Sequence, residues 1–492
     1  MSLVEVIKRP AETLSEITIP VDHTNGEDPP AGLVFASQSA VDAWFADRGV
    51  TAMKNLEAAW RATPNIVGHP ITFELVSGVH RPPQAGRQGG FLLEGKSMST
   101  NGVDVTVRGV LPSSWTVIQA AATVTGYSNS GNNPYLDFAA STFPNDGSLK
   151  GRFVSLDTGQ VVIVHDHTDS RLEVIQQLSP APTAGVTQAT IVKPATIMRN
   201  SLDDIAGAGS IAGVYARNNG VRAFSPVAFE NILFECYGAF YASLGDGQPT
   251  KYTYCHVDLP TEFAAHGLTA ADYAGGMGGF GEYASNYNCS ALGTKLISRT
   301  PSGPAFPFIQ YGYAQNSYYN GFGTGNTASD RTLFQATSMV IANMQSRAVF
   351  LKYGCKFEVQ DFFPGRRTTI RGGPGLRMES DAMIRAESSC KIWFEDVEGP
   401  CIQVGDDCHI VAGKSGPNFA NGPLGGNDDV GIEFHPSAVG ATVSLGNGTV
   451  TVNGSVGDVR MPDGSLVAWS SLASYGDFAL DAATGARIVR SA

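Results

Sequence analysis

The sequence lacks long apolar runs and contains few charged residues. No stretch reaches the roughly 18 consecutive apolar residues that a membrane-spanning helix needs, so no membrane insertion is expected. Charged residues make up 16% of the 492 residues, whereas 57 residues are glycine. This balance favours many tight corners and few solvated helices. Residues 1–20 also lack the charged and then apolar order of a signal peptide, so export by the general secretory route is not expected.

A basic face is missing as well. The formal net charge is −12 at pH 7, whereas binding to a phosphate backbone requires a cluster of Lys and Arg side chains. The nearest basic group, formed by Arg366, Arg367 and Arg371, is small. The composition therefore predicts that nucleic acid is not a partner.

The seven cysteines do not form a recognisable metal or disulfide pattern. Their odd number cannot pair fully within one chain. The spacing from Cys390 through Cys401 to Cys408 is not a zinc-binding pattern, and no histidine series completes it. We therefore interpret the cysteines as small apolar residues buried in a β core, with a disulfide or a link between subunits as the alternative.

Motifs of common enzyme and cofactor sites are absent too. The sequence contains no nucleophile elbow, no Walker phosphate loop and no H-E-x-x-H metal helix. The glycine-rich stretch 321–325 is too short a match for a phosphate-binding motif and is interpreted as a loop. No cofactor is predicted.

What the sequence does contain is a short unit that repeats between Ala348 and Val411: a few apolar residues, then a polar or glycine-bearing corner. The apolar pieces are mostly about seven to nine residues apart, and a helical period near 3.6 is never sustained between the corners. Short strands at regular spacing produce such a pattern. The pieces are centred near Phe350, Phe357, Ile370, Leu376, Ile384, Trp393, Ile402 and Ile410.

Taking every third piece separates them into three series. Members of a series are roughly 23 to 27 residues apart, which suits a solenoid turn made of three strands. The pattern therefore predicts a right-handed parallel β-helix, a mainly β rod with a long wall rather than one deep pocket. The series are Phe350, Leu376 and Ile402; Phe357, Ile384 and Ile410; and Ile370 and Trp393.

Changes of rhythm along the chain divide it into five predicted regions. They are an N-terminal arm for attachment, capping helices with the first rungs, a small inserted β domain, a central β-helix with long Gly/Tyr-rich loops, and a β-rich C-terminal tip. In the inserted domain, apolar stretches are separated by tight turns, which is typical of antiparallel strands. The predicted bounds are 1–30, 31–112, 113–201, 202–430 and 431–492.

Two amphipathic helices are expected ahead of the rod. Ser39 can cap the first helix, whose apolar side includes Trp44. Thr51 can cap the second, whose apolar side includes Trp60. Such helices can cover the open end of a solenoid, whose terminal strand otherwise exposes unpaired backbone groups.

His165 and His167 are the candidates for metal ligands. In a strand their side chains would point to one face, as two ligands of one ion require. The sequence offers no identifiable third ligand, and the segment lies where a hairpin is expected to turn. A polar turn is therefore the alternative, and no metal is predicted.

Carboxylates near the predicted rungs are candidates for glycoside cleavage, which needs two acids on either side of the scissile bond. Adjacent rungs lie about 4.8 Å apart, so acids one or two rungs apart could meet that geometry. Solvated acids at the corners, which keep a β-helix soluble, are the alternative. The candidates are Glu379, Asp381, Glu387, Glu395, Asp396, Glu398, Asp406 and Asp407.

Aromatic side chains crowd a glycine- and asparagine-rich stretch near residues 306–322. Tyrosine combines an apolar ring with a polar tip and favours exposed recognition surfaces, so these rings could stack on sugars. Packing of loops onto the rod, or a subunit interface, is the alternative. The candidate carbohydrate contacts are Tyr311, Tyr313, Tyr318 and Tyr319.

The order of these features resembles bacteriophage spike and fibre proteins of the pectate-lyase-like β-helix type. An arm, capping helices, a β-helix and a β-rich tip follow one another, and the stretch from Lys150 to Pro182 is similar to insertions of such virion proteins. The resemblance covers most of the chain at the level of architecture. The calcium-binding aspartates and the arginine of the pectate lyases are not found, so lyase activity is not implied.

The resemblance implies a homotrimer that projects from the surface of a phage or phage-like particle, held to other virion proteins by its N-terminal arm. It implies decoration or attachment to a host surface polysaccharide. It assigns no catalytic residue, because these residues vary between members. A polysaccharide depolymerase is the alternative. A cellular β-helix adhesin is a third possibility, which the missing signal peptide disfavours.

Overall fold

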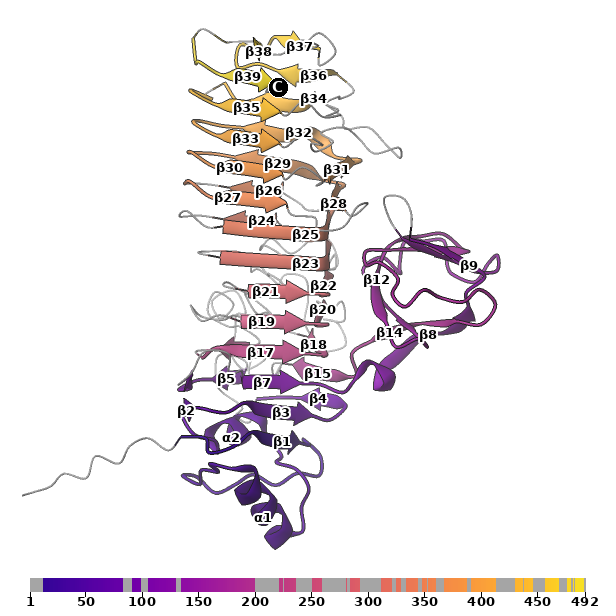
Figure 1. Ribbon diagram of the computed structural model, residues 1–492, viewed down its shortest axis with the longest axis vertical. Helices are drawn as coiled ribbons and strands as arrows, with labels where there is room; N and C mark the ends of the chain where they lie inside the picture. The colour runs from indigo at the N-terminus through magenta and orange to yellow at the C-terminus, as the bar shows by residue number, and fades with distance from the viewer. Residues whose placement is uncertain are drawn as a thin grey trace, which may run out of the picture.

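The computed structural model is a rod with a second β module mounted on one side (Figure 1). It describes residues 12–82, 91–98, 105–129, 134–199, 221–223, 225–235, 250–258, 280, 284–292, 311–320, 324–328, 333–343, 347–351, 353–359, 367–386, 391–412, 430–436, 438–445, 456–468, 476–478, 481 and 483–490. Within these ranges, no helix is long and apolar enough to cross a membrane.

The longest ladder of parallel strands extends from one end of the rod to the other. Between its two end strands, each strand pairs in parallel with the strand one turn earlier and with the strand one turn later. Its members are β1 (Ile17–Val21), β3 (Ile71–Leu75), β7 (Val105–Arg108), β17 (Val227–Glu230), β19 (Thr250–Thr253), β21 (Ala284–Tyr287), β23 (Tyr311–Asn320), β25 (Leu333–Ala342), β27 (Lys356–Val359), β30 (Met383–Ala386), β33 (His409–Ala412), β35 (Thr442–Leu445) and β39 (Arg487–Arg490).

A second parallel ladder lies beside the first and shares the long strands β23 and β25 with it. Its other members are β4 (Gly78–His80), β15 (Thr196–Arg199), β18 (Ile232–Glu235), β20 (His256–Asp258), β22 (Ser290–Leu292), β28 (Arg367–Arg371) and β31 (Lys391–Glu395).

A third parallel ladder forms the remaining side of the later turns. It contains β24 (Thr324–Ala328), β26 (Arg347–Leu351), β29 (Pro374–Met378), β32 (Glu398–Val404), β34 (Val430–Phe434) and β36 (Gly457–Arg460). Near the start of the rod, two short parallel pairs are β2 (Ile66–Val67) with β6 (Ser97–Met98) and β5 (Phe91–Leu93) with β16 (Val221–Ala223).

The ladders confirm the predicted parallel β-helix. The right-handed winding that the sequence predicts is the handedness of nearly all parallel β crossovers. At the C-terminal end, β37 (Leu466–Val467) pairs antiparallel with β36, and β38 (Gly476–Phe478) pairs antiparallel with β39. These pairs form the β-rich tip, where each closing strand covers part of an edge that stacking would leave open.

The core of the rod follows the second predicted series. Phe357 pairs with Ile384, and Ile384 pairs with Ile410, as the sequence predicts. The column continues through Val443 to Ile488, and all five side chains are fully buried. Removing a side chain of this size from water contributes about 1.5–3 kcal/mol.

The other two series are shifted by one residue at one member each. Val349, rather than Phe350, pairs with Leu376. Phe394, rather than Trp393, pairs with Ile370. Spacing alone cannot decide which of two adjacent apolar residues points inward, because successive side chains of a strand face opposite sides.

Helices α1 (Gln38–Arg48) and α2 (Leu56–Arg61) lie at the amino-terminal end of the rod (Figure 1). Their N-caps are Ser37 and Asn55, not the predicted Ser39 and Thr51. Both observed caps have extended backbones, and their side chains accept hydrogen bonds from the first turn, which an N-cap requires. Ser39 already lies inside α1, and Thr51 lies ahead of the segment that turns into α2.

Helix α2 is held to the first rungs by Trp60. The indole stacks on Phe73 of β3 with 5.5 Å between ring centroids, and its Nε1 donates a hydrogen bond of 2.8 Å to the Glu94 carbonyl. Part of the predicted arm is also in the rod, because β1 is the first strand of the long ladder. Residues 1–11 of that arm lie outside the described residues.

The predicted antiparallel insertion is confirmed, and it has a core of its own. Its strands form a seven-stranded sheet in the order β8-β14-β11-β12-β13-β10-β9, around buried side chains such as Leu136, Val154, Val162 and Leu172. The strands, preceded by a short 3-10 helix (Pro112–Ser114), are β8 (Thr116–Thr123), β9 (Gly126–Ser128), β10 (Tyr135–Asp137), β11 (Phe153–Leu156), β12 (Val161–His167), β13 (Arg171–Val174) and β14 (Gln188–Lys193).

The insertion occupies a corner of the rod. In the following turns, a corner of only one or two residues joins the first ladder to the second, and Asn231, Tyr254 and Asn288 take positive φ there. Gly109 begins the same corner one turn earlier: its N–H donates to the Glu230 carbonyl at 2.8 Å, as that of Asn231 does to the Thr253 carbonyl. The insertion therefore interrupts a corner and leaves the ladders continuous.

The cysteines within the described ranges are buried, which confirms their interpretation as small apolar residues. Cys355 and Cys408 alternate with Ala382 and Ala441 immediately before successive strands of the first ladder, so these small side chains occupy equivalent places. Burial raises the pKa of Cys408 to about 11. The buried cysteines are Cys255, Cys289, Cys355, Cys401 and Cys408; Cys236 and Cys390 lie outside the described residues.

Candidate functional site

The insertion packs on the rod through a buried apolar seam. Phe153 and Ile163 of the insertion belong to the same cluster as Tyr318 and Val340 of the rod. These rod residues lie on β23 and β25, in turns that follow β15, where the chain returns from the insertion. The insertion therefore lies alongside later turns of the rod (Figure 1). The whole cluster is Trp115, Phe153, Val161, Ile163, Ile175, Val192, Leu292, Tyr318, Val340 and Ala342.

Gly151 lets the two parts approach closely. Its backbone has φ +75°, and a Cβ there would lie 2.6 Å from Tyr318 and 2.7 Å from Leu292. Its carbonyl accepts a hydrogen bond of 2.6 Å from the Ser290 hydroxyl of β22. A side chain at this position would need both an unfavourable backbone conformation and a displaced seam.

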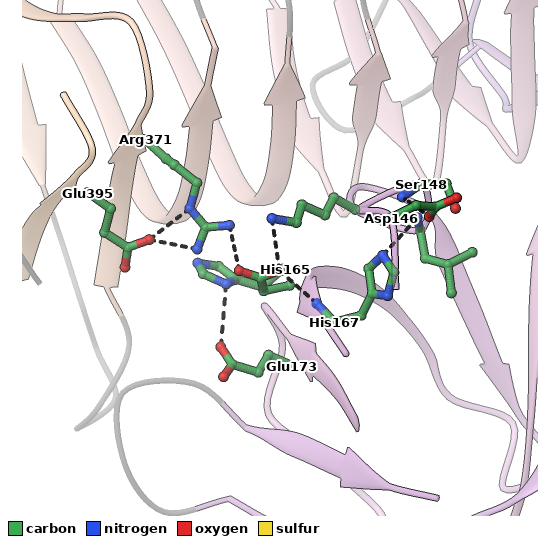
Figure 2. Close-up of polar contacts among 10 residues, drawn as sticks. Asp146, Ser148, His165, His167, Glu173, Arg371 and Glu395 are labelled. Atoms are coloured by element: carbon green, nitrogen blue, oxygen red, sulfur yellow. Dashed lines mark hydrogen bonds and ion pairs between the residues drawn. The ribbon is translucent and has the colours of Figure 1, made fainter. Parts of the chain in front are cut away.

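Beside the seam lies a group of linked ion pairs, and the pair between Arg371 and Asp166 joins the rod to the insertion (Figure 2). Arg371 of β28 pairs with Glu395 of β31 at 2.6 Å and with Asp166 of β12 at 2.9 Å. Lys150 reaches the other oxygen of Asp166 at 2.9 Å. Burial by itself would raise the pKa of Asp166, but the charges of Arg371 and Lys150 outweigh it and lower the pKa. Glu395 is only 1% exposed, so its carboxylate has little contact with water and lies against the Arg371 guanidinium.

Nothing in the sequence predicts this junction. Asp166 and Arg371 are 205 residues apart, and no motif or spacing links them. Two features of the sequence are related to the junction: the insertion is flanked by rod strands, and charged residues stand next to apolar strand positions. Neither feature identifies which charged residues pair.

Of the two histidines considered as metal ligands, His165 reaches the rod, and His167 contacts the insertion. Strand β12 continues to His167, so both histidines lie on the strand, and the predicted polar turn occupies only residues 168–170. His165 Nε2 lies 3.4 Å from Thr369 Oγ1, and its Nδ1 lies 3.7 Å from a Glu173 carboxylate oxygen. His167 Nε2 accepts a hydrogen bond from the Leu149 N–H at 3.3 Å. Among the described residues, no group of three or more His, Cys, Asp or Glu could hold a metal ion.

A second polar contact crosses the junction near β20. Arg152 of the insertion lies 3.5 Å from both His256 Nε2 and a carboxylate oxygen of Asp258. His256 is almost fully buried, and Phe153 meets its ring edge to face at 5.9 Å. Burial lowers the pKa of His256, although Asp258 acts in the opposite direction.

Two of the four candidate carbohydrate tyrosines are buried. Tyr318 is 1% exposed and belongs to the seam, and Tyr319 is fully buried with its hydroxyl 3.0 Å from Asn286 Nδ2. A ring without an exposed face cannot stack on a sugar, so for these two residues the structure contradicts the predicted role and favours the packing alternative. Tyr311 and Tyr313 lie on β23, but their side chains lie outside the described part of the chain. Their role stays a prediction.

Most of the candidate carboxylates have positions that explain them without catalysis. Asp381, Asp396 and Asp407 take φ between 50° and 65°, a left-handed conformation that aspartate tolerates better than most residues. Glu395 is committed to the junction. Glu398 is exposed at the start of β32, and Glu387 lies outside the described residues.

Glu379 and Asp406 differ from the other acids because they line a common hollow on the rod. The hollow has a volume of about 140 Å³ and lies where β29, β32 and β34 end. Arg377 pairs with Glu379 at 2.5 Å at its wall, and both side chains are about one third exposed. The lining residues are Arg377, Met378, Glu379, Ser380, Gln403, Gly405, Asp406 and His435.

Comparisons with known proteins give similarity to phage tailspikes. No family model and no curated protein matches the chain. The tailspike protein gp49 from Pseudomonas phage LKA1 matches with a TM-score of 0.25 and 11% identity, over 89% of this chain and 81% of that chain. The Gp54 tailspike of Acinetobacter baumannii bacteriophage AP22, solved with a capsular saccharide, matches with a TM-score of 0.17 and 10% identity, over 88% and 80%. At these scores the likeness carries no functional argument.

Proposed function

We propose that this chain is a structural protein of a phage or phage-like particle, a homotrimeric spike or fibre that projects from the particle for decoration or for attachment to a host surface polysaccharide. One observation carries the proposal: the first ladder continues from β1 to β39, so that most of the chain winds into a single rod. A solenoid of this kind presents a long surface along a single axis.

The rod is suited to projection because of how its strands are bonded. Strands in the middle of each ladder are hydrogen-bonded on one edge to the turn before and on the other to the turn after. Bending the rod would strain several ladders and the buried core at once. The insertion adds a side module without interrupting these ladders, because it enters at a corner. A stiff column with a lateral module is suited to display outside a particle.

The trimer and the attachment through the N-terminal arm are inferred from the resemblance in architecture to spike and fibre proteins. Because β1 already belongs to the rod, the proposed attachment segment is the part of the chain that precedes Ile17. The remaining surface of the rod would then be available to neighbouring rods and to polysaccharide.

A polysaccharide depolymerase is the second candidate, and one observation favours it. Glu379 and Asp406, from successive turns, line the same hollow. Cleavage of a glycosidic bond needs two carboxyl groups on either side of the bond. In this function, one of the two acids would protonate the leaving oxygen, and the other would act as base or nucleophile.

Two measurements test the proposal. Light scattering should give three times the chain mass of 51.8 kDa, and a monomer at micromolar concentration would contradict the trimer. Incubation with purified capsular polysaccharide or lipopolysaccharide should leave the amount of reducing ends and unsaturated products unchanged. Release of oligosaccharide that disappears in Glu379→Gln or Asp406→Asn would replace the structural role with the depolymerase.

A further inference from the structure

One corner of the rod carries a column of residues in successive turns. The Gly354 N–H donates to the Ser380 carbonyl at 3.0 Å, and the Asp381 N–H donates to the Asp406 carbonyl at 3.0 Å. The Asp407 N–H continues the column by donating to the Val439 carbonyl at 2.8 Å. These bonds place Tyr353, Ser380 and Asp406 at equivalent positions of neighbouring turns, about 4.8 Å apart.

Tyr353 is an unexpected residue for this corner. It has φ 52°, and a bulky side chain in the left-handed region costs on the order of 1–3 kcal/mol. At the equivalent position of the next turn, Ser380 also has positive φ. At the following position, which Gly354 occupies in this turn, later turns carry Asp381, Asp407 and Gly440, and Asp and Gly adopt this conformation more easily than Tyr. The ring does not recover the cost through burial, because the residue is 57% exposed. A strained and exposed aromatic residue therefore suggests a role outside the fold.

The hollow begins one turn above Tyr353. Ser380, which receives the hydrogen bond from Gly354, is part of the lining, and the Glu379 N–H donates to the Leu351 carbonyl at 3.0 Å. The hollow offers two carboxylates, a guanidinium, an amide and an imidazole at one exposed place. Gln403 is already oriented, because its Nε2 donates to Glu433 at 2.7 Å.

This combination suits a sugar. The apolar face of a pyranose ring stacks on an aromatic ring, while neighbouring hydroxyls form hydrogen bonds with carboxylates and with charged donors. The hollow, with a volume of about 140 Å³, has room for one sugar unit. The neighbouring units of a glycan would then lie along the column of corner residues. A lipid or an apolar peptide would instead have to remove the charges of Glu379 and Asp406 from water.

We propose that the hollow and Tyr353 form a saccharide-binding subsite for one unit of a surface polysaccharide. Tyr353 provides the stacking platform, and Glu379 and Asp406 accept hydrogen bonds from sugar hydroxyls. Arg377, which pairs with Glu379 at 2.5 Å, positions that carboxylate. The inference deepens the proposed attachment function and rests on it, because it assumes that the chain meets a glycan.

The test is binding to a printed array of bacterial capsular and O-antigen oligosaccharides, followed by titration of the strongest binder. Tyr353→Ala and Tyr353→Asn should each weaken binding about tenfold, which corresponds to about 1.4 kcal/mol. Tyr353→Phe should bind within about twofold of wild type, because it keeps the ring. Glu379→Gln and Asp406→Asn should weaken binding without any change in reducing ends.

The variant Tyr353→Asn separates lost binding from lost folding. Asparagine adopts positive φ more readily than tyrosine does. The melting temperature of the variant should therefore equal or exceed that of the wild type, while its binding to the saccharide falls. Tyr127→Ala is the control, since Tyr127 is 40% exposed but lies on the insertion. Wild-type binding that Tyr353→Asn retains in full would overturn the subsite and leave attachment standing. A wild type that binds nothing on the array would overturn both proposals.

Discussion

The rod and the insertion are built from strands in opposite ways. In the rod, apart from the antiparallel pairs at the tip, the ladders join strands from different turns in parallel, so a strand is stable only when its neighbouring turns are present. In the insertion, antiparallel strands close around a separate core, and β11, β12 and β13 follow one another in the chain. The insertion therefore has the local contacts that favour independent folding, and the rod does not.

Their ion pairs differ too. On the rod wall, Arg108 pairs with Glu230 at 2.7 Å while its side chain is 38% exposed, and such surface pairs contribute about 0–1 kcal/mol. At the junction, Arg371 is 11% exposed and Glu395 is 2% exposed. Water screens the first pair and not the second. Both pairs join neighbouring turns of the rod, so the difference between them is burial, and only Arg371 also reaches the insertion, through Asp166.

The largest expected effect comes from breaking the buried pair. Arg371→Met should lower the free energy of unfolding by about 3–5 kcal/mol, because the Glu395 carboxylate would stay buried without the guanidinium. Arg108→Met, the matched change on the rod wall, should cost about 1 kcal/mol or less. Chemical unfolding checks both variants. Equal losses would show that the junction is no different from the exposed wall.

The next effect comes from the close approach at Gly151. Gly151→Ala should cost about 2–3 kcal/mol, because the new Cβ meets Tyr318 and Leu292 in addition to straining the backbone. Gly159→Ala is the control: its φ is +89°, but no heavy atom lies within 4 Å of a Cβ there. That change should cost about 1 kcal/mol. Melting temperatures of the two variants should therefore separate, and coincident values would argue against a tight seam.

A smaller effect should appear on acidification. Burial lowers the pKa of His256 from its ordinary value of 6.5, so the unfolded chain takes up the proton more readily, and stability is lost as the pH falls below about 6.5. The pKa values of Asp166 and Asp258 are also lowered, from 3.8, so their contributions are lost only in stronger acid.

Protection factors for hydrogen exchange at β20 and β22, which are referenced to the slower intrinsic exchange at lower pH, should therefore fall between pH 7 and pH 5 in the wild type. His256→Gln, which cannot take up a proton, should show a smaller change in the same strands. His80 at the amino-terminal end of the rod also has a lowered pKa, so the variant keeps its acid sensitivity there. A His256→Gln variant whose protection factors at the junction fall as much as those of the wild type would contradict this account.

The smallest effect is expected inside the rod core. Cys355→Ala should cost about 1 kcal/mol, because neighbouring turns already carry Ala382 and Ala441 at the equivalent position. Iodoacetamide should not label Cys355 or Cys408 in the native protein, since both thiols are buried. Peptide mass spectrometry checks this outcome. Rapid labelling of either thiol would show that the turns open readily.

The sequence predicts the rod better than it predicts the sites, for physical reasons. Each turn of the rod repeats the one before it, so residues that pair between turns recur at a regular spacing in the sequence. Phe357, Ile384 and Ile410 have this spacing, and they do pair with one another in successive turns. The same spacing could not show whether Trp393 or Phe394 faces the core, because adjacent side chains of a strand point to opposite sides. Fold and repeat could be predicted, and the facing of individual side chains could not.

The junction and the hollow could not be predicted at all. The junction joins Asp166 to Arg371 across 205 residues, and it occurs once, so no periodicity reveals it. The hollow depends on which corner residues lie above Tyr353, and that depends on the bonds between turns. Tyr318 was a reasonable candidate by composition, but the packed insertion covers it.

The central claim is that the chain projects from a particle as a trimeric spike. A cryo-electron microscopy map of the intact particle that carries the chain tests it most directly. We predict three rods around one axis, with helices α1 and α2 toward the particle and the tip formed by β37 and β38 outward. A map with the chain missing from the particle, or with a single rod buried inside it, would contradict the account.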